Sequence, residues 1–357
     1  MQPIPTTKSP HSFAEFTTQK GARIFRIPIQ AFPGFWVYAY LVFVDDLIVL
    51  IDTGSGFGDS DKELLAGFEE VRARFGLDIR VEALDYILIT HGHIDHIGGL
   101  PYLCKRTDAL VGIHELDLRN LTNYEERIFV SVRRLREFLI EAGVGDEKCE
   151  EIMRVYEVNK ALFSSVPVDF TFDAIGMQLE NRFEFQHVPG HSAGHVVIRL
   201  DDYLFCGDHV LNGISPHQWP ERLTMNMGLG HYFDSLDKLD AWAGDNITLT
   251  LSGHNEAIEN LHDRIMEIKQ IHAQRLVRTL EILSTPGTIA EVSSQLFGEV
   301  GGYDILLSVE EAGAHVEYLY QRGLLGISNI EEIEQGGVPL LYERMSDAVA
   351  EQVRICC

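Results

Sequence analysis

Runs of apolar residues dominate the first part of the chain. The runs 23–29, 36–44 and 47–52 are rich in β-branched and aromatic side chains, and Asp45 and Asp46 interrupt the last two. This pattern predicts three β-strands with a tight turn at the two aspartates. Strands this apolar need cover on both faces, so the pattern favours an α/β sandwich of sheets layered with helices.

The spacing of apolar residues changes further along. Residues 1–20, rich in Pro, Ser and Thr, predict an irregular lead-in. Helical spacing over 61–75, ended by Gly76, predicts a helix, and the short run 87–89 predicts the next strand. A second, shorter helix is expected over 100–106 and a strand over 109–114. These elements together predict a strand, helix, strand unit followed by further layers.

Residues 115–165 interrupt the β pattern with two charged, amphipathic segments, 126–143 and 149–163. They predict a helical insertion, which is suited to act as a lid over a site nearby. Strand-like runs return at 168–172, 181–188 and 195–200 and before residues 208 and 254. A helix is expected over 233–244.

The last part of the chain has a different pattern. Helices are predicted over 264–283 and 309–321, and Thr288 and Glu291 fit a capping box that opens a helix ending at Phe297. Two short apolar runs, 323–327 and 338–344, can pair as a β wing. We therefore expect a lead-in over 1–22, a catalytic domain over 23–262 and a winged-helix-like domain over 263–357.

Charge and cysteine content narrow the partners. The chain has 54 acidic against 29 Lys and Arg residues, a formal net charge of −25. Such a field repels polyanions, so we expect a small-molecule substrate, no membrane partner and no nucleic acid without a local basic patch. The acidic C-terminal region favours docking, including a homodimer. An odd number of cysteines without CxxC spacing, and no signal-peptide pattern, predict a cytoplasmic protein.

Candidate chemistry is concentrated directly after the strand 87–89. There His91, His93, Asp95 and His96 lie within six residues, followed by a Gly-Gly pair. Imidazole and carboxylate are ligands for zinc, iron and manganese. His91 and His93 alternate along the chain and can face one ion, and Asp95 and His96 can reach a second ion. The alternative is a polar loop in which the histidines occur by chance.

Further along, three more candidates follow apolar strands. His191 is predicted as the third ligand of the first ion, His254 as the last ligand of the second, and Asp208 as the carboxylate that bridges both. Asp52 is predicted to hold a ligand histidine, with a plain turn aspartate as the alternative, and His195 to support its loop by hydrogen bonds.

An irregular region, residues 212–231, follows the predicted bridging aspartate. Loops beside a site often line its pocket, so Trp219, His231 and Tyr232 are candidates for substrate contact. Their position alone supports this interpretation, and roles in the core or on the surface are the alternatives.

The motifs THGHIDHIGG, PGHSAGH, GDH and SGH occur in that order, and with them the sequence resembles the metallo-β-lactamase-fold hydrolase superfamily. The resemblance covers residues 23–262. It implies an αββα sandwich with a binuclear site at one edge. In that arrangement His91, His93 and His191 hold one metal, Asp95, His96 and His254 hold the other, and Asp208 bridges them. The long C-terminal helix and the predicted winged module resemble the appendage that members of one β-lactamase-like branch carry.

Departures from known branches narrow the expected activity. True β-lactamases of this fold lack the full second ligand set, and flavodiiron proteins have glutamate where His93 stands. Glyoxalase II shares the HxHxDH motif and Asp208, but no GCGR-like glutathione-binding segment follows GDHVL here. The β-CASP insertion of the large nucleases is missing too.

The resemblance and the predicted ligands together imply a hydrolase with two divalent metal ions. We expect zinc, with manganese or iron as alternatives, because the same ligands serve all three. The predicted reaction is attack by metal-bound hydroxide on a small ester, thioester or lactone, with Asp95 as the proton shuttle. A single-strand endoribonuclease or phosphodiesterase and a non-catalytic metal-binding scaffold are the alternatives.

Overall fold

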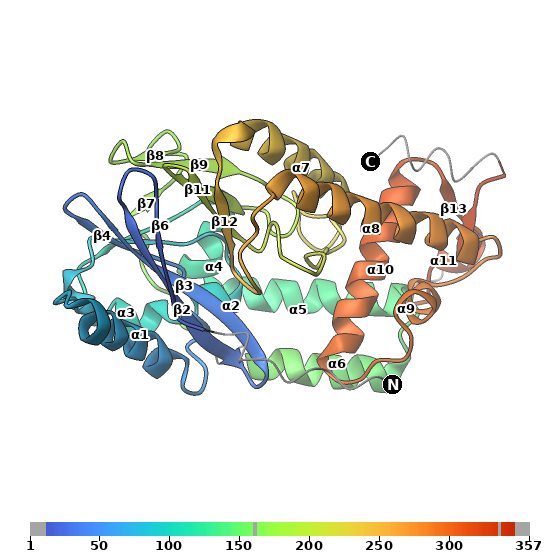
Figure 1. The fold of residues 1–357 in the computed structure, drawn as a ribbon. Helices are drawn as coiled ribbons and strands as arrows, with labels where there is room; N and C mark the ends of the chain where they lie inside the picture. Colours follow the sequence, from blue (N-terminus) through green and yellow to red (C-terminus); the bar gives the residue numbers. More distant parts are fainter. Residues whose placement is uncertain (1–11, 160–162, 335–336, 347–357) are drawn as a thin grey trace, which may run out of the picture.

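The computed structural model describes residues 12–159, 163–334 and 337–346, and Figure 1 shows its architecture. A seven-stranded sheet is formed by consecutive strands in the order β1 to β7. The pairs from β1 to β4 are antiparallel, and β4 to β7 pair in parallel. Its strands are β1 (Ala14–Thr17), β2 (Arg23–Phe32), β3 (Phe35–Val44), β4 (Leu47–Ile51), β5 (Tyr86–Leu88), β6 (Leu110–Ile113) and β7 (Phe170–Thr171).

A five-stranded sheet in the order β12-β11-β10-β9-β8 packs against the first. Only its β11 and β12 pair in parallel; the other neighbours are antiparallel. Its strands are β8 (Gln178–Leu179), β9 (Phe183–His187), β10 (Val196–Leu200), β11 (Tyr203–Gly207) and β12 (Leu249–Ser252).

The fold has four layers of helices and sheets, and a hydrophobic cluster fills each space between neighbouring layers. One apolar cluster lies between the two sheets and includes Tyr40 from β3 and Phe205 from β11, whose ring centroids are 5.2 Å apart. A second joins the first sheet to helix α1 (Ser60–Phe75) and to the short helices α2 (Ile94–Ile97) and α3 (Leu100–Leu103). A third joins the second sheet to α7 (Leu229–Ala243). The order helix, sheet, sheet, helix agrees with the predicted αββα sandwich.

The predicted insertion is helical. It comprises a 3-10 turn at Glu115–Asp117 followed by α4 (Leu118–Thr122), α5 (Tyr124–Glu141) and α6 (Asp146–Asn159). Two further 3-10 turns, Val81–Ala83 and Gly244–Asn246, lie elsewhere in the chain. The C-terminal region contains α8 (Leu261–Ile282), α9 (Ile289–Phe297), α10 (Tyr303–Gln321) and α11 (Ile330–Ile333), and β13 (Leu325–Ile327) pairs antiparallel with β14 (Tyr342–Arg344). None of the helices in the described ranges is long and apolar enough to cross a bilayer.

The C-terminal helices share a hydrophobic core with the rest of the chain. Side chains of α5, α6, α7, α8 and α10 belong to the same apolar cluster, and Figure 1 shows α10 running across α5 and α6. Backbone hydrogen bonds add to this contact: the amide of Ala290 donates to Ala142, and the amide of Leu340 donates to Glu141. The end of α5 and the beginning of α6 therefore pack against the C-terminal region.

The structure differs from the sequence prediction in several elements. Part of the expected lead-in forms β1, because Ala14–Thr17 pair with Arg23–Arg26 along the sheet edge; residues 1–11 lie outside the described part. Helix α10 begins at Tyr303 rather than residue 309, and the helix predicted over 100–106 ends at Leu103. The helix over 61–75 and the capping box at Thr288 and Glu291 are confirmed.

Candidate metal centre

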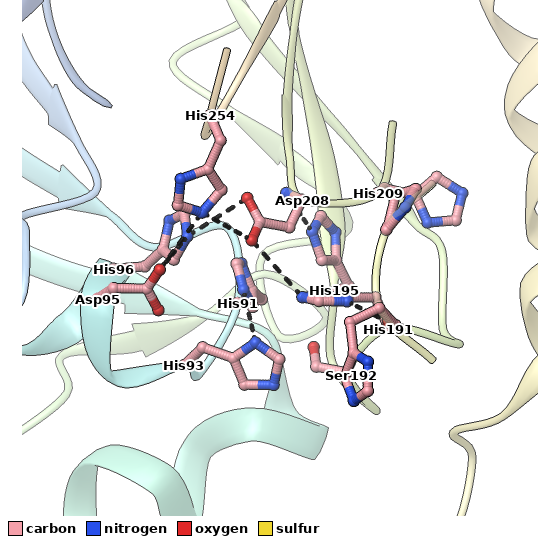
Figure 2. Close-up of polar contacts among 12 residues, drawn as sticks. His91, His93, Asp95, His96, His191, Ser192, His195, Asp208, His209 and His254 are labelled. Carbon is pink, nitrogen blue, oxygen red and sulfur yellow. Dashed lines mark hydrogen bonds and ion pairs between the residues drawn. The ribbon is translucent and has the colours of Figure 1, made fainter. Parts of the chain in front are cut away.

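The histidines and aspartates singled out in the sequence meet at one edge of the sandwich, where strands of both sheets end (Figure 2). His91 and His93 lie between β5 and α2, and Asp95 and His96 lie on α2 itself. The others follow strands of the second sheet and are His191 after β9, Asp208 after β11 and His254 after β12. Residues far apart in sequence are thus brought together at one site.

His91, His93 and His191 form the first group, with one nitrogen of each within 4.8 Å of the others. Nε2 of His91 lies 3.1 Å from Nδ1 of His93, and the rings of His93 and His191 have centroids 4.6 Å apart. Burial lowers the pKa of all three imidazoles, that of His93 to about 3. These rings are therefore neutral near pH 7, which is the state that binds a metal.

Asp95, His96, Asp208 and His254 form the second group and are all buried. Nε2 of His254 lies 3.0 Å from Oδ2 of Asp208 and 3.3 Å from Oδ2 of Asp95. Burial opposes the charged form, but the carboxylates of Asp208 and Asp95 outweigh it and raise the pKa of His254 to about 10. Burial also acts on Asp95, yet His96 and His254 hold the pKa of its carboxyl at about 2.

Asp208 faces both groups. Its Oδ1 lies 3.4 Å from Nε2 of His96, and its Oδ2 lies 3.7 Å from Nε2 of His191. Nε2 of His96, Nε2 of His191 and Oδ1 of Asp208 are buried without a hydrogen-bond partner in the described part of the chain. Buried polar atoms normally have partners, and the ones left over here are metal-ligand atoms that face each other. The donor set therefore fits a pair of divalent cations.

Comparison with known proteins agrees with this geometry. Residues 34–265 match the family profile described as the metallo-beta-lactamase superfamily. The chain belongs to that superfamily. Members of it are mostly metal-dependent hydrolases.

Individual relatives are distant. The metallo-beta-lactamase fold-containing protein ST1585 of Sulfurisphaera tokodaii is 28% identical over 204 residues, which are 56% of this chain and 66% of that protein. A hydroxyacylglutathione hydrolase of Xylella fastidiosa strain M23 is 30% identical over 122 residues, 34% of this chain and 31% of its own length. In both cases the match spans less than two thirds of the relative.

A solved structure extends the likeness of fold beyond the matched family region. The metallo-beta-lactamase family protein TTHA1429 of Thermus thermophilus superimposes with a TM-score of 0.72 at 23% identity, and the alignment covers 90% of this chain and 98% of that one. At this identity the likeness shows the fold alone. It nevertheless includes most of the C-terminal region as well as the metallo-beta-lactamase sandwich.

Within the metallo-beta-lactamase fold, Asp52 lies at the end of β4 behind the second group. Its backbone has a φ of 57°, in the left-handed region, and its carboxylate accepts hydrogen bonds from the amide and hydroxyl of Thr90. Oδ2 of Asp52 also lies 2.8 Å from Nδ1 of His96. The carboxylate therefore orients His96 and turns its Nε2 toward Asp208 and Asp95.

Other contacts fix the ligand loops. Nε2 of His195 accepts a hydrogen bond from the amide of Asp208 at 3.1 Å, and its ring stacks on His91 with centroids 4.6 Å apart. Asp117, which the sequence interpretation missed, accepts from the amide of Gly92 and the hydroxyl of Ser192. It joins the two loops that carry the first group, and its only sequence signal is a carboxylate near the start of the helical insertion.

Two backbone carbonyls also hold ligands. Nδ1 of His254 lies 2.5 Å from the carbonyl oxygen of Trp36, and Nδ1 of His191 lies 2.8 Å from that of His217. Each contact leaves the Nε2 atom of the histidine for the metal centre. No residue type marks such a carbonyl in a sequence, so neither contact was predictable.

The predicted substrate contacts lie in three different settings. The Trp219 ring lies beside His93, with centroids 6.0 Å apart. His231 pairs with Glu221 at 3.0 Å, and both line a cavity of about 190 Å³ against α10. Tyr232 is completely buried and donates its hydroxyl to the carbonyl of His209, so a substrate contact for Tyr232 is wrong: its ring has no surface to offer.

His209 follows Asp208 directly, and its position in the sequence makes it an alternative ligand. Figure 2 shows its ring pointing away from the other histidines and from Asp208. Its centroid lies 5.1 Å from that of Tyr232 within the packed layer under α7. His209 is therefore part of the core and not of the metal centre.

Proposed function

We propose that this protein is a hydrolase that uses two divalent cations to cleave a small carboxylic ester, thioester or lactone. The observation that carries the proposal is the pair of adjacent ligand groups that share the Asp208 carboxylate. Cations bound there would lower the pKa of a water molecule, so that it could act as a nucleophile near neutral pH. Zinc is our first expectation, with manganese and iron as alternatives.

The chain's own residues have separate roles in this proposal. One cation would be held by His91, His93 and His191 and the other by Asp95, His96 and His254, with Asp208 placed to serve both. Oδ2 of Asp95 lies within 3.3 Å of Nε2 of His254 at the edge of the second group. We assign Asp95 the further task of accepting the proton of the attacking water and returning it to the leaving group.

Aromatic side chains beside each ligand group support a substrate with an acyl or lactone group. Phe35 is 47% exposed and its ring centroid lies 4.7 Å from that of His254 in the second group, and the Trp219 ring centroid lies 6.0 Å from that of His93 in the first group. The net charge of −25 disfavours a nucleic-acid substrate. The match to a hydroxyacylglutathione hydrolase supports thioesters as a class to test.

We further propose that residues 263–357 form a winged-helix-like module. Three helices, α8 to α10, precede the antiparallel pair β13 and β14. Because the region is acidic, we propose that it supports the catalytic domain or forms homodimer contacts, and that it does not bind nucleic acid.

A parallel hydrolysis assay tests the proposed activity. The metal content of the purified protein is measured, and the protein is then reloaded with zinc. It is incubated in parallel with acyl-CoA thioesters, homoserine lactones, a phosphodiester reporter and single-stranded RNA. We expect turnover of a thioester or lactone that is abolished in both Asp208→Ala and Asp208→Asn, with folding of each variant checked by circular dichroism. RNA cleavage that persists in about 0.2 M salt and is lost in the same variants would replace our proposal with the nuclease.

A further inference from the structure

A second cluster of buried titratable side chains lies outside the metal centre, between α8 and α10. Nδ1 of His315 donates to the backbone carbonyl of Glu311 at 2.7 Å, so its Nε2 is the acceptor for Nδ1 of His272 at 3.2 Å. Oε1 of Glu311 accepts from the guanidinium of Arg275 at 2.8 Å. The cluster consists of the buried His272, Glu310, Glu311 and His315 and of the partly buried Arg275.

His272, Glu311 and His315 have the composition and spacing of a third metal site. The hydrogen bonds argue against that interpretation. Nδ1 of His272 donates its proton to Nε2 of His315, so the lone pair of that nitrogen is already in use, and the guanidinium of Arg275 neutralises the only carboxylate among the three. A cation placed between them would lie beside that guanidinium, so the repulsion of like charges opposes metal binding. The cluster is better explained as a support for something it contacts.

The cluster contacts the irregular segment that follows Asp208. Oε2 of Glu311 accepts from the backbone amide of Gln218 at 2.7 Å, and Arg275 donates to the hydroxyl of Ser215 at 2.9 Å. The imidazole of His217 lies between the two glutamates of α10, with Nε2 at 3.3 Å from Oε2 of Glu310. Side chains from the C-terminal helices therefore hold residues 215–218 in place.

The same segment holds a candidate metal ligand. The carbonyl of His217 accepts the Nδ1 proton of His191, and this hydrogen bond leaves Nε2 of His191 directed at the metal centre. Such outer contacts fix the tautomer and the orientation of a metal-binding histidine. Residues 212–228 contain no helix or strand, so no regular hydrogen-bond ladder places the His217 carbonyl. Its position depends on the contacts with α8 and α10.

We propose that Glu311 is a positioning residue of the metal centre. The carboxylate of Glu311 accepts a hydrogen bond from the amide of Gln218, which belongs to the same peptide group as the carbonyl of His217. The position of that carbonyl in turn orients the ring of His191. The C-terminal region thereby completes the first ligand group of a centre built otherwise by the sandwich. The inference rests on metal binding by the proposed hydrolase but not on its substrate.

Glu317 provides a matched control on the same helix. Its carboxylate accepts from the amides of Glu221 and Arg222, further along the same irregular segment. Like Glu311, it links α10 to this segment through backbone amides, but the amides it binds lie beyond His217 and Gln218. A general loosening of the segment should affect both variants, whereas positioning of His191 should depend on Glu311.

The test is zinc binding to the full chain, measured by competition with a chromophoric chelator. The single variants are Glu311→Ala, Glu311→Gln, Arg275→Met, Glu317→Ala and His191→Ala, and a double variant combines Glu311→Ala with His191→Ala. We expect Glu311→Ala to weaken one of two zinc sites about tenfold and to leave the other unchanged. The loss should be smaller in Glu311→Gln, which keeps an acceptor oxygen for the Gln218 amide, and absent in Glu317→Ala.

The double variant separates positioning from general damage. If Glu311 acts through His191, its replacement should cost nothing more once His191 is gone. An additional loss in the double variant, wild-type affinity in Glu311→Ala, or an equal loss in Glu317→Ala would overturn the inference. So would a third zinc ion in the wild type that Glu311→Ala removes. Should Glu311→Ala not fold, Arg275→Met decides, and unchanged affinity in that variant overturns the inference.

The outcome is distinguishable from failure of the proposed activity. A wild type that binds two zinc ions but hydrolyses no ester, thioester or lactone would refute the proposed function and leave the role of Glu311 intact. Hydrolysis with zinc affinities that are the same in wild type and Glu311→Ala would refute the role of Glu311 alone. A wild type that binds neither zinc nor manganese nor iron would refute both.

Discussion

At the scale of single residues, the buried carboxyl group of Glu310 is the least expected feature. Its side chain is completely buried, its Oε1 has no partner in the described part of the chain, and its Oε2 contacts His217. Burial raises the pKa of this carboxyl well above its usual value of 4.5. Folding therefore favours the protonated form of the Glu310 carboxyl over the charged form.

This protonation predicts how stability depends on pH. Because the pKa of Glu310 is raised on folding, its contribution is fully present below the unfolded pKa of about 4.5 and is lost as pH rises toward the folded value. Glu310→Gln resembles the protonated form at every pH. The variant should match wild type at pH 5 and become more stable than wild type toward pH 8, by up to about 1.4 kcal/mol per pH unit.

Urea unfolding of both proteins at several pH values between about 5 and 8 measures the difference. Comparing the two proteins cancels the titration of the groups that they share. Parallel stability curves would show that Glu310 titrates normally, and the assignment of a buried neutral carboxyl would then be wrong.

At the scale of elements, a close backbone crossing places the ligand-bearing helix α2. Gly98, which ends α2, passes so near the loop after β4 that an added Cβ would lie 1.8 Å from the carbonyl oxygen of Ser55. The amide of the next residue, Gly99, donates to the carbonyl of Gly54, and that of Thr53 donates to His96. The crossing ties the strand end that carries Asp52 to the helix that carries His96.

We therefore expect Gly98→Ala to force these two segments apart. The cost should be at least about 1–3 kcal/mol, the range for overpacked sites, because the contact is with backbone that cannot rotate away. Thermal unfolding measures it, and metal affinity should fall as well. Gly145→Ala is the control, since nothing lies within 4 Å of its added Cβ and its φ is unrestricted. Equal stability of the two variants would contradict the crossing.

Local pattern predicted most elements but not how distant ones pack together. The helix over 61–75 and the capping box at Thr288 depend on neighbouring residues, and the sequence shows both. β1 pairs at a sheet edge without a marked apolar pattern, so its formation depends on a partner strand. The first turns of α10 were missed although Ile305, Leu306 and Val309 are buried at helical spacing.

The same distinction applies to the site. Side chains with metal-ligand chemistry after strands were visible in the sequence, and the structure brings them together. The supporting contacts were not visible, because Asp117 reaches Ser192 across 75 positions and His217 offers only a carbonyl. Tyr232 was misplaced since proximity to Asp208 in sequence does not show which way a ring points.

At the scale of the whole molecule, one hydrophobic cluster unites parts that the sequence divided at residue 262. It contains Leu139 and Ile152 of the insertion, Leu236 of α7, and Leu276 and Leu319 of the C-terminal helices. Helix α8 also begins at Leu261, within the predicted catalytic domain. Because apolar burial is shared across the boundary, neither part retains its full core without the other.

This shared core predicts that the chain unfolds as one cooperative unit. Leu319→Ala removes a fully buried side chain on α10 and should cost about 2–5 kcal/mol. Amide hydrogen exchange under weakly denaturing conditions should then show the same loss of protection in α8, α10 and the distant strand β3. Ile330→Ala, at a residue that is 63% exposed, should change stability by less than about 0.5 kcal/mol. Loss of protection confined to the C-terminal helices in Leu319→Ala would instead show that residues 263–357 fold as a separate domain.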